Sequence, residues 1–209
     1  MSHMQSDEKW RPFDKQHKTE VMGIVNVTPD SFSDGGAYNT VVSAVDHALA
    51  LVNDGADILD IGGESTRPGA DYVDEAEETN RVVPVIEALV EKTDRPVSID
   101  TYKSKTAEAA VNAGASIIND VWGGLYDPEI LDVAAATKAK LIITHNRKDR
   151  NYTDFMTDVC EDLRRQIEAA KKRGVQKEQI ILDPGVGFAK SPAQNIEVIR
   201  HLDDIAVWG

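Results

Sequence analysis

Polar and acidic side chains recur close to the ends of short apolar runs in this 209-residue chain. The residues that share this placement are Asn26, Asp60, Asp100, Asn119, His145 and Asp183. If the apolar runs are parallel strands, their carboxyl ends meet at one edge of a sheet, where α/β proteins build their active sites. Each residue taken alone could instead cap the helix that follows it. Asp60 is the weakest candidate, because it lies inside an apolar run and could serve structure only.

The elements that would position these side chains alternate between strand and helix patterns from residue 21 onward. Short Val- and Ile-rich runs predict buried parallel strands at 21–25, 58–61, 97–99, 116–118, 141–144 and 180–182. Amphipathic stretches predict helices at 40–53, 74–91, 103–113, 128–137, 154–173 and 193–206. Glycines 55, 114 and 174 follow three of these helices, where left-handed caps are expected. The pattern predicts an α/β fold of six βα units, whereas a closed (β/α)8 barrel needs eight.

Composition limits the classes of function. The chain has 36 acidic and 23 basic residues, which argues against general binding of nucleic acid or of a membrane surface. An anionic substrate would therefore be held locally, by a metal or a few cations. The sequence carries neither a long apolar run nor a secretory signal, so we expect a soluble, cytoplasmic protein. The lone Cys160 is expected to be a packed or surface thiol.

One domain is expected over residues 21–209, preceded by a polar extension over residues 1–20. The first four residues, Met-Ser-His-Met, are typical of a remnant of an expression tag. No linker, repeat or low-complexity tract indicates a second domain.

Three segments carry a family resemblance. They are Asn-Val-Thr-Pro-Asp-Ser-Phe-Ser-Asp-Gly-Gly at 26–36, Gly-Gly-Glu-Ser-Thr-Arg-Pro-Gly at 62–69, and Asp-Pro-Gly-Val-Gly-Phe-Ala-Lys at 183–190. Ser-Ile-Asp-Thr at 98–101 and Ile-Asn-Asp at 118–120 lie between them. In this order the segments resemble dihydropteroate synthase, which joins a pterin to para-aminobenzoate. The resemblance runs from about residue 21 to the end of the chain and implies a TIM (β/α)8 barrel.

The resemblance implies a pterin pocket built from Asp100, Asn119 and Asp183. A pterin offers a row of ring N–H and amino donors, for which carboxylates are natural acceptors, and an asparagine amide can pair with both kinds of group. Val121 would supply apolar surface against the ring, and Phe188 would flank the pocket mouth. Ordinary core packing is the alternative role for both.

The same resemblance implies magnesium as the cofactor, bound through Asn26. Mg²⁺ prefers oxygen ligands and is usually shared with substrate phosphates, so one side-chain oxygen can suffice. Thr66 would contact the pterin or the pyrophosphate. Asp34 would stabilise a transient pterin cation on the first loop, and Arg67 would lie beside para-aminobenzoate on the second loop.

The implied reaction is a dissociative substitution. Pyrophosphate leaves a dihydropterin methyl pyrophosphate, and the aniline nitrogen of para-aminobenzoate then attacks the delocalised cation. No nucleophilic side chain is needed, which fits the absence of Ser-His-Asp and Cys-His patterns.

The sequence also departs from the family. The fifth strand ends in Thr144-His145-Asn146, where the family often has Met-His-Met, so Thr144 replaces a sulfur that packs near the pterin. His145 could be structural or catalytic. The family continues past the position of residue 209 with a loop Lys that contacts pterin and a strand-end Arg that contacts pyrophosphate. We therefore expect the chain to be part of a longer synthase, whose further helices would mediate a homodimer.

Two other functions stay open at this point. The chain could be a pterin-binding module without synthetic activity, or a related barrel that handles methyltetrahydrofolate for methyl transfer. The first two motifs argue against the second of these.

Overall fold

The computed structural model describes residues 19–28, 36–65 and 72–208 of the chain. Within these ranges, a six-stranded parallel sheet forms the frame of the fold, and its spatial order β1 to β6 is the order of the sequence. The strands are β1 Met22–Asn26, β2 Ile58–Gly62, β3 Val97–Asp100, β4 Ile117–Asp120, β5 Lys140–Thr144 and β6 Ile180–Asp183. This sequential order is the arrangement of a barrel, and the predicted α/β fold with six βα units is confirmed. The described sheet is open, with β1 and β6 at its edges.

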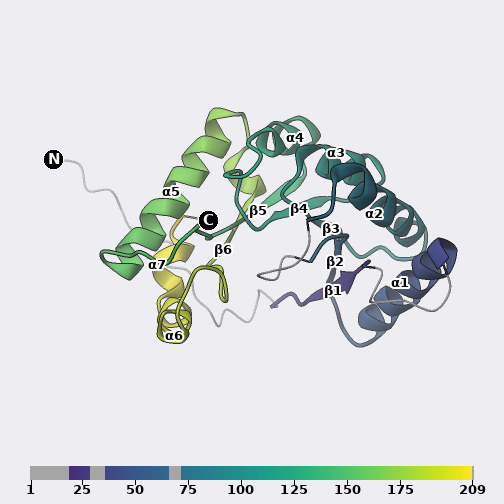
Figure 1. Ribbon diagram of the computed structural model, residues 1–209, viewed down its shortest axis with the longest axis horizontal. Coiled ribbons are helices and arrows are strands. Elements are labelled where there is room, and N and C mark those ends of the chain that lie inside the picture. The colour runs from purple at the N-terminus through teal and green to yellow at the C-terminus, as the bar shows by residue number, and fades with distance from the viewer. Residues whose placement is uncertain (1–18, 29–35, 66–71, 209) are drawn as a thin grey trace.

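Helices cover the outer face of the curved sheet (Figure 1), running from α1 beside β1 to α5 beside β5. Their bounds are α1 Gly36–Asn53, α2 Glu75–Val90, α3 Ser104–Asn112, α4 Glu129–Thr137, α5 Phe155–Lys172, α6 Pro192–Arg200 and α7 Leu202–Ala206. A short 3₁₀ helix, η2 Lys177–Gln179, leads into β6. Among the described residues, no helix is long and apolar enough to span a membrane.

Alternation along each strand separates an apolar outer face from a polar inner face. Leu59, Ile61, Ile99 and Ile118 are each 0% exposed and belong to the core shared with the helices. The residues between them, such as Asp60 and Asp100, must point to the opposite, concave face, because successive side chains in a strand alternate. The sheet therefore buries its outer face for stability and presents its inner face for chemistry.

The strands extend further than the sequence predicts. Asn26, Asp100 and Asp183 are the last residues of their strands, and Asn119 lies inside β4, whereas these residues were expected just beyond the strand ends. The reason is that ladder bonds continue past the apolar runs; the Thr101 amide, for example, donates to the Asn119 carbonyl at 3.1 Å. Only His145 directly follows its strand.

Helix boundaries also differ in two places. The helix expected at 40–53 begins at Gly36, and the single helix expected at 193–206 is two helices separated at His201. The His201 backbone, with φ −115° and ψ 29°, leaves the helical region and ends α6. The predicted left-handed caps are confirmed, since Gly55, Gly114 and Gly174 all have positive φ.

Truncating one side chain on each face of the sheet should change stability by very different amounts. Ile99→Ala removes a 0% exposed side chain from the outer face and should lower the unfolding free energy by about 2–5 kcal/mol. Ile24→Ala is the control, because Ile24 is 61% exposed in the described sheet and should change it by under about 1 kcal/mol. Urea unfolding followed by circular dichroism measures both, and equal losses would contradict the assignment of the two faces.

Candidate functional site

Strand register brings three predicted site residues into one row across the concave face. Asn26 pairs with Gly62, Gly62 with Asp100, and Asp100 with Asn119 along four neighbouring strands. Gly62 makes the row compact: a Cβ added there would lie 3.4 Å from Asp100 Oδ2 and 3.7 Å from Asn26 Oδ1. The missing side chain thus leaves one space that both oxygens border.

Asp60 is a more substantial candidate than its sequence position suggested. It lies in the middle of β2 rather than after it, and its side chain is 4% exposed. Its Oδ2 accepts a 2.9 Å hydrogen bond from Asn119 Nδ2. That bond fixes which end of the Asn119 amide faces Asp60, and so leaves the Asn119 carbonyl oxygen available as an acceptor.

Four buried oxygens on this face have no hydrogen-bond partner among the described residues. They are Asp60 Oδ1, Ser98 Oγ, Asp100 Oδ1 and Thr144 Oγ1, and Ser98 stands opposite Asp60 in the register of β2 with β3. Thr144 ends β5 and is 1% exposed, and it stands opposite Asp183 in the register with β6. Buried polar atoms cost free energy when they are left unsatisfied, so such a group indicates a place where a ligand or water completes the bonding.

The carboxylates around Asp100 disfavour its negative charge. Burial raises the pKa of Asp100 well above its usual value, and the negative charges of Asp60, Glu78, Asp120 and Glu64 raise it further. Burial likewise raises the pKa of Asp60. A ligand that donates hydrogen bonds to ionised Asp100 would offset part of this cost, since such bonds favour the charged form.

Asp183 reaches the same end of the sheet from β6. Its Oδ1 accepts a 2.7 Å bond from the Gly185 amide, so the side chain also holds the turn that follows the strand. That turn begins the segment with Phe188 and Lys190, and Asp183 is therefore bonded to the loop that forms one side of the pocket.

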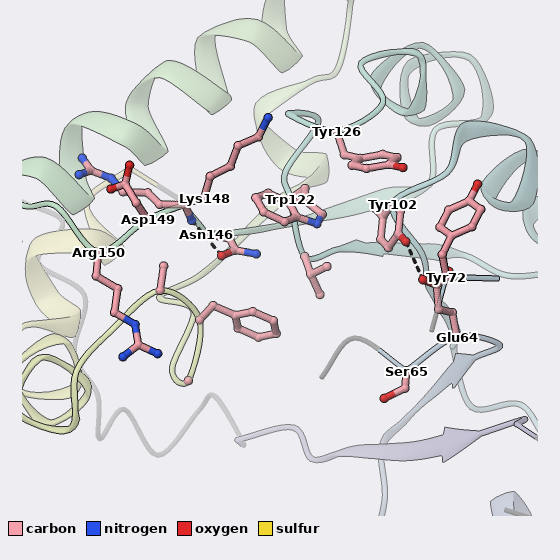
Figure 2. Close-up of a pocket in the computed structure, with 15 residues that line it drawn as sticks. Glu64, Ser65, Tyr72, Tyr102, Trp122, Tyr126, Asn146, Lys148, Asp149 and Arg150 are labelled. Carbon is pink, nitrogen blue, oxygen red and sulfur yellow. Dashed lines mark hydrogen bonds between the residues drawn. The ribbon is translucent and has the colours of Figure 1, made fainter. Parts of the chain in front are cut away.

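A pocket of about 520 Å³ opens beside these strand ends (Figure 2). Val121 and Phe188, the two predicted apolar contacts, both contribute to its lining. Figure 2 shows Glu64, Tyr72 and Tyr102 on one side and Lys148 and Arg150 on the other. Its remaining lining residues are Ser65, Trp122, Tyr126, Asn146, Arg147, Asp149, Gly187 and Ala189. The pocket therefore combines aromatic walls with both signs of charge.

Three predicted residues cannot be placed in this geometry. Asp34, Thr66 and Arg67 lie outside the described residues, so their roles stay predictions.

A buried ion cluster next to the pocket was missed by the sequence reasoning. Lys103, 2% exposed, bonds to the carboxylates of Glu64 and Glu78 and to the Val73 carbonyl, the last at 2.7 Å. Tyr102 donates to the other oxygen of Glu64 at 2.6 Å. One ammonium thus joins residues that precede and follow the 66–71 segment. The partners lie 25 to 39 positions away from Lys103, so no local pattern could have paired them.

Asn26 alone offers magnesium one protein ligand, so the residues present fit this ion only if substrate oxygens and water complete its coordination. Among the described residues, no group of three His, Cys, Asp or Glu side chains could hold a metal ion. Asn26 is exposed at the end of β1, and its oxygen borders the same space as Asp100 Oδ2. A single neutral oxygen suits an ion that keeps waters and binds phosphate oxygens.

Known proteins match the chain closely. A family model described as "Pterin binding enzyme" matches residues 22–208. Dihydropteroate synthase of Bacillus subtilis is 51% identical over 188 residues, which are 90% of this chain and 66% of that protein. The chain belongs to the dihydropteroate synthase family. It spans about two thirds of the length of this relative.

Solved members of the dihydropteroate synthase family share the fold. The enzyme of Clostridium difficile, solved in the presence of pteroic acid, is 49% identical with a TM-score of 0.88 over 93% of this chain and 75% of that one. The enzyme of Xanthomonas albilineans, solved with 4-aminobenzoic acid, is 50% identical with a TM-score of 0.82 over 88% and 67%. The comparisons therefore do not favour the methyltetrahydrofolate alternative.

The buried Lys103 cluster yields a stability prediction. Lys103→Met would leave Glu64 and Glu78 buried without their cation, and we expect a loss of about 3–5 kcal/mol in unfolding free energy. Lys105→Met is the control, because Lys105 pairs with Glu75 while its side chain is 76% exposed, and such exposed pairs contribute little to stability. Chemical denaturation of both variants measures the difference. A Lys103→Met protein as stable as the control would show that the cluster is dispensable.

Proposed function

We propose that this chain carries the pterin site of a dihydropteroate synthase. The reaction condenses 6-hydroxymethyl-7,8-dihydropterin pyrophosphate with para-aminobenzoate to give dihydropteroate and pyrophosphate. The observation that carries the proposal is the pair of unsatisfied oxygens Asp100 Oδ1 and Thr144 Oγ1 on the concave face, beside the Asn119 amide that Asp60 orients. Family membership, and the pteroic acid and 4-aminobenzoic acid present with the two solved relatives, support this choice of substrates.

The proposed binding roles follow from hydrogen-bonding capacity. Asp100 and Asp183 accept from the amino and N–H groups of the pterin, and Asn119 pairs with a ring nitrogen and its neighbour. Val121 packs against the ring, while Phe188 flanks the mouth that para-aminobenzoate enters. Because the pKa of Asp100 is raised, pterin binding should be strongest at pH values above that pKa, where Asp100 is an acceptor.

Proposed catalysis rests on positioning and charge rather than on a nucleophile. Asn26 would hold Mg²⁺, which when bound would neutralise the charge that builds up on the departing pyrophosphate. The pterin methylene loses its bond to the pyrophosphate oxygen and gains one to the aniline nitrogen, which then releases a proton. Asp34 would stabilise the intermediate cation, Arg67 would lie beside para-aminobenzoate, and Thr66 would contact the pterin or the pyrophosphate. Excluding water from the concave face would protect the cation.

The partners of the protein would be small molecules rather than nucleic acid or membrane, which the excess of acidic residues supports. We also propose a cytoplasmic location, as expected from the sequence, and a homodimer, which the family resemblance implies.

Substitutions in the cross-strand row test the proposed function. With Mg²⁺ and para-aminobenzoate present, Asn26→Ala and Asp100→Asn should each release pyrophosphate about 10- to 100-fold more slowly, the effect of losing one charged or metal-linked contact. Asp100→Asn should fold at least as stably as the parent, since it removes a buried charge. Asp46→Asn on the exposed side of α1 is the matched control.

Turnover that is unchanged in both variants would refute the site. Calorimetric binding of the pterin without any pyrophosphate release would instead indicate a pterin-binding module.

Thr144 offers a separate test of the pterin position. Thr144→Val keeps the shape of the buried side chain and removes only the hydroxyl that lacks a partner in the described structure. If a pterin N–H group donates a hydrogen bond to that hydroxyl, calorimetry should show that the variant binds pterin about 3- to 10-fold more weakly. This factor corresponds to the loss of one neutral hydrogen bond. A variant with tighter binding would mean that Thr144 faces no polar group of the ligand.

A further inference from the structure

A buried lysine lies at the centre of the two loops that line the pocket. Lys190 is 3% exposed, and its ammonium donates to the carbonyls of Gly185 at 2.8 Å and Phe188 at 3.1 Å, within its own loop. It also donates to His145 Nδ1 at 2.8 Å and to the His145 carbonyl at 3.2 Å, at the end of β5. Among the described residues Lys190 has no carboxylate within ion-pair distance, so backbone oxygens and an imidazole take the place of its hydration shell.

The β6–α6 loop is folded tightly around this charge. Gly185 has φ +69°, and a Cβ there would lie 1.9 Å from the His145 carbonyl oxygen. Ala189, directly before Lys190, has φ +47°, a left-handed conformation that costs a non-glycine residue free energy. The three N–H donors of the ammonium, shared among these four acceptors, offset this cost, and one of the contacts holds the Phe188 backbone.

His145 links Lys190 to helix α5 through its two ring nitrogens. An ammonium can only donate, so Nδ1 must accept and the ring proton must be on Nε2, which donates to Asp162 at 3.2 Å. Burial lowers the pKa of His145 to about 4, and the charge of Lys190 lowers it in the same direction. The imidazole is therefore neutral and held in one tautomer near neutral pH. It bonds to this network within the protein, which favours the structural role over the catalytic one.

Further contacts connect Asp162 back to the β6–α6 loop. Asp162 also accepts from Arg147, whose guanidinium lies 4.5 Å from the centre of the Tyr152 ring. Tyr152 donates its hydroxyl to the Ala189 carbonyl at 3.0 Å, next to Lys190. This closed ring, Lys190–His145–Asp162–Arg147–Tyr152, joins the β5–α5 loop to the β6–α6 loop, and residues 146–150 and 187–189 of these two loops line the pocket.

We infer that Lys190 is a positioning residue, whose buried ammonium fixes Phe188 and the β5–α5 loop as one preformed wall for the second, aromatic substrate. The inference rests on the proposed function. The wall meets the proposed pterin contacts only at Asp183, whose backbone carbonyl accepts from the His145 amide at 2.9 Å, since neither Asp100 nor Asn119 bonds to any member of the ring. The Asp183 carboxylate is held separately, by the Gly185 amide. Loss of Lys190 should therefore weaken the aminobenzoate step much more than pterin binding.

Kinetics of the complete protein test the inference. Lys190→Met keeps the length of the chain without its charge, and the KM for 4-aminobenzoate should rise about tenfold while pterin affinity stays within about twofold. Lys172→Met, in the exposed last turn of α5, is the control and should change neither. Tyr152→Phe removes one hydroxyl from the ring and should raise the same KM by a smaller factor. It takes the place of Lys190→Met if that variant does not fold.

The pH dependence provides a second measurement. Burial lowers the pKa of Lys190 to about 8, against the opposing effect of Asp183. The charged groups that face it are Asp183 on β6, Arg147 in the β5–α5 loop and Asp162 on α5, with neutral His145 between. The ammonium is present below about pH 8 and lost above it, so the KM for 4-aminobenzoate should rise as pH increases through 8. Lys190→Met should lack this rise.

Two spectra separate failure of the inference from failure of the proposed function. The chain has five histidines, so ¹⁵N-histidine labelling should resolve His145 as an Nε2–H tautomer that does not titrate above about pH 5, and Lys190→Met should raise its pKa. The chain has four phenylalanines, and the ¹⁹F signal of fluorinated Phe188 should shift in the same variant. Both readings are independent of synthesis. An unchanged Phe188 signal, or an unchanged KM in a folded Lys190→Met protein, overturns the inference.

Discussion

Parallel strand register is the constraint on which the candidate site depends. The ladder from β1 to β4 places Asn26, Gly62, Asp100 and Asn119 in one row, although these residues are up to 93 positions apart in the chain. A shift of one residue in any strand would turn its member of the row toward the helices, where the core is apolar. Burial of Leu59, Ile61 and Ile99 on the outer face prevents that shift. Burial of the outer face therefore also fixes the direction in which the polar side chains point.

Gathering several carboxylates around Asp100 has an electrostatic cost. Asp60, Asp100, Asp120, Glu64 and Glu78 are close enough for their charges and their burial to raise the pKa of Asp100. Two buried ammoniums, Lys103 and Lys190, lie in the loops after β3 and β6. Lys103 pairs directly with Glu64 and Glu78, whereas Lys190 bonds to carbonyls and His145. Such an arrangement favours a ligand rich in hydrogen-bond donors, because the ligand supplies what the protein leaves unsatisfied.

The two lysines illustrate how the loops are held at the strand ends. Lys103 joins Glu64 and Val73, which precede and follow the segment with Thr66 and Arg67. Lys190 joins the end of β5 to the loop after β6. In both places a long side chain from the loop between a strand and its helix reaches into the preceding βα unit. A few buried charges thus help to hold neighbouring loops together.

The sequence by itself determined the kind of fold and the kind of site, because both depend on local pattern. Hydrophobic runs of strand length located all six strands. The three motifs and the two segments between them indicated the family, and that resemblance singled out Asp100, Asn119 and Asp183. Only the tertiary structure decided that Asp60 bonds to Asn119, that Lys103 neutralises Glu64 and Glu78, and that His145 is a neutral link to Lys190. These contacts join residues 25 to 59 positions apart, and their bonding depends on register and burial, which no single segment encodes.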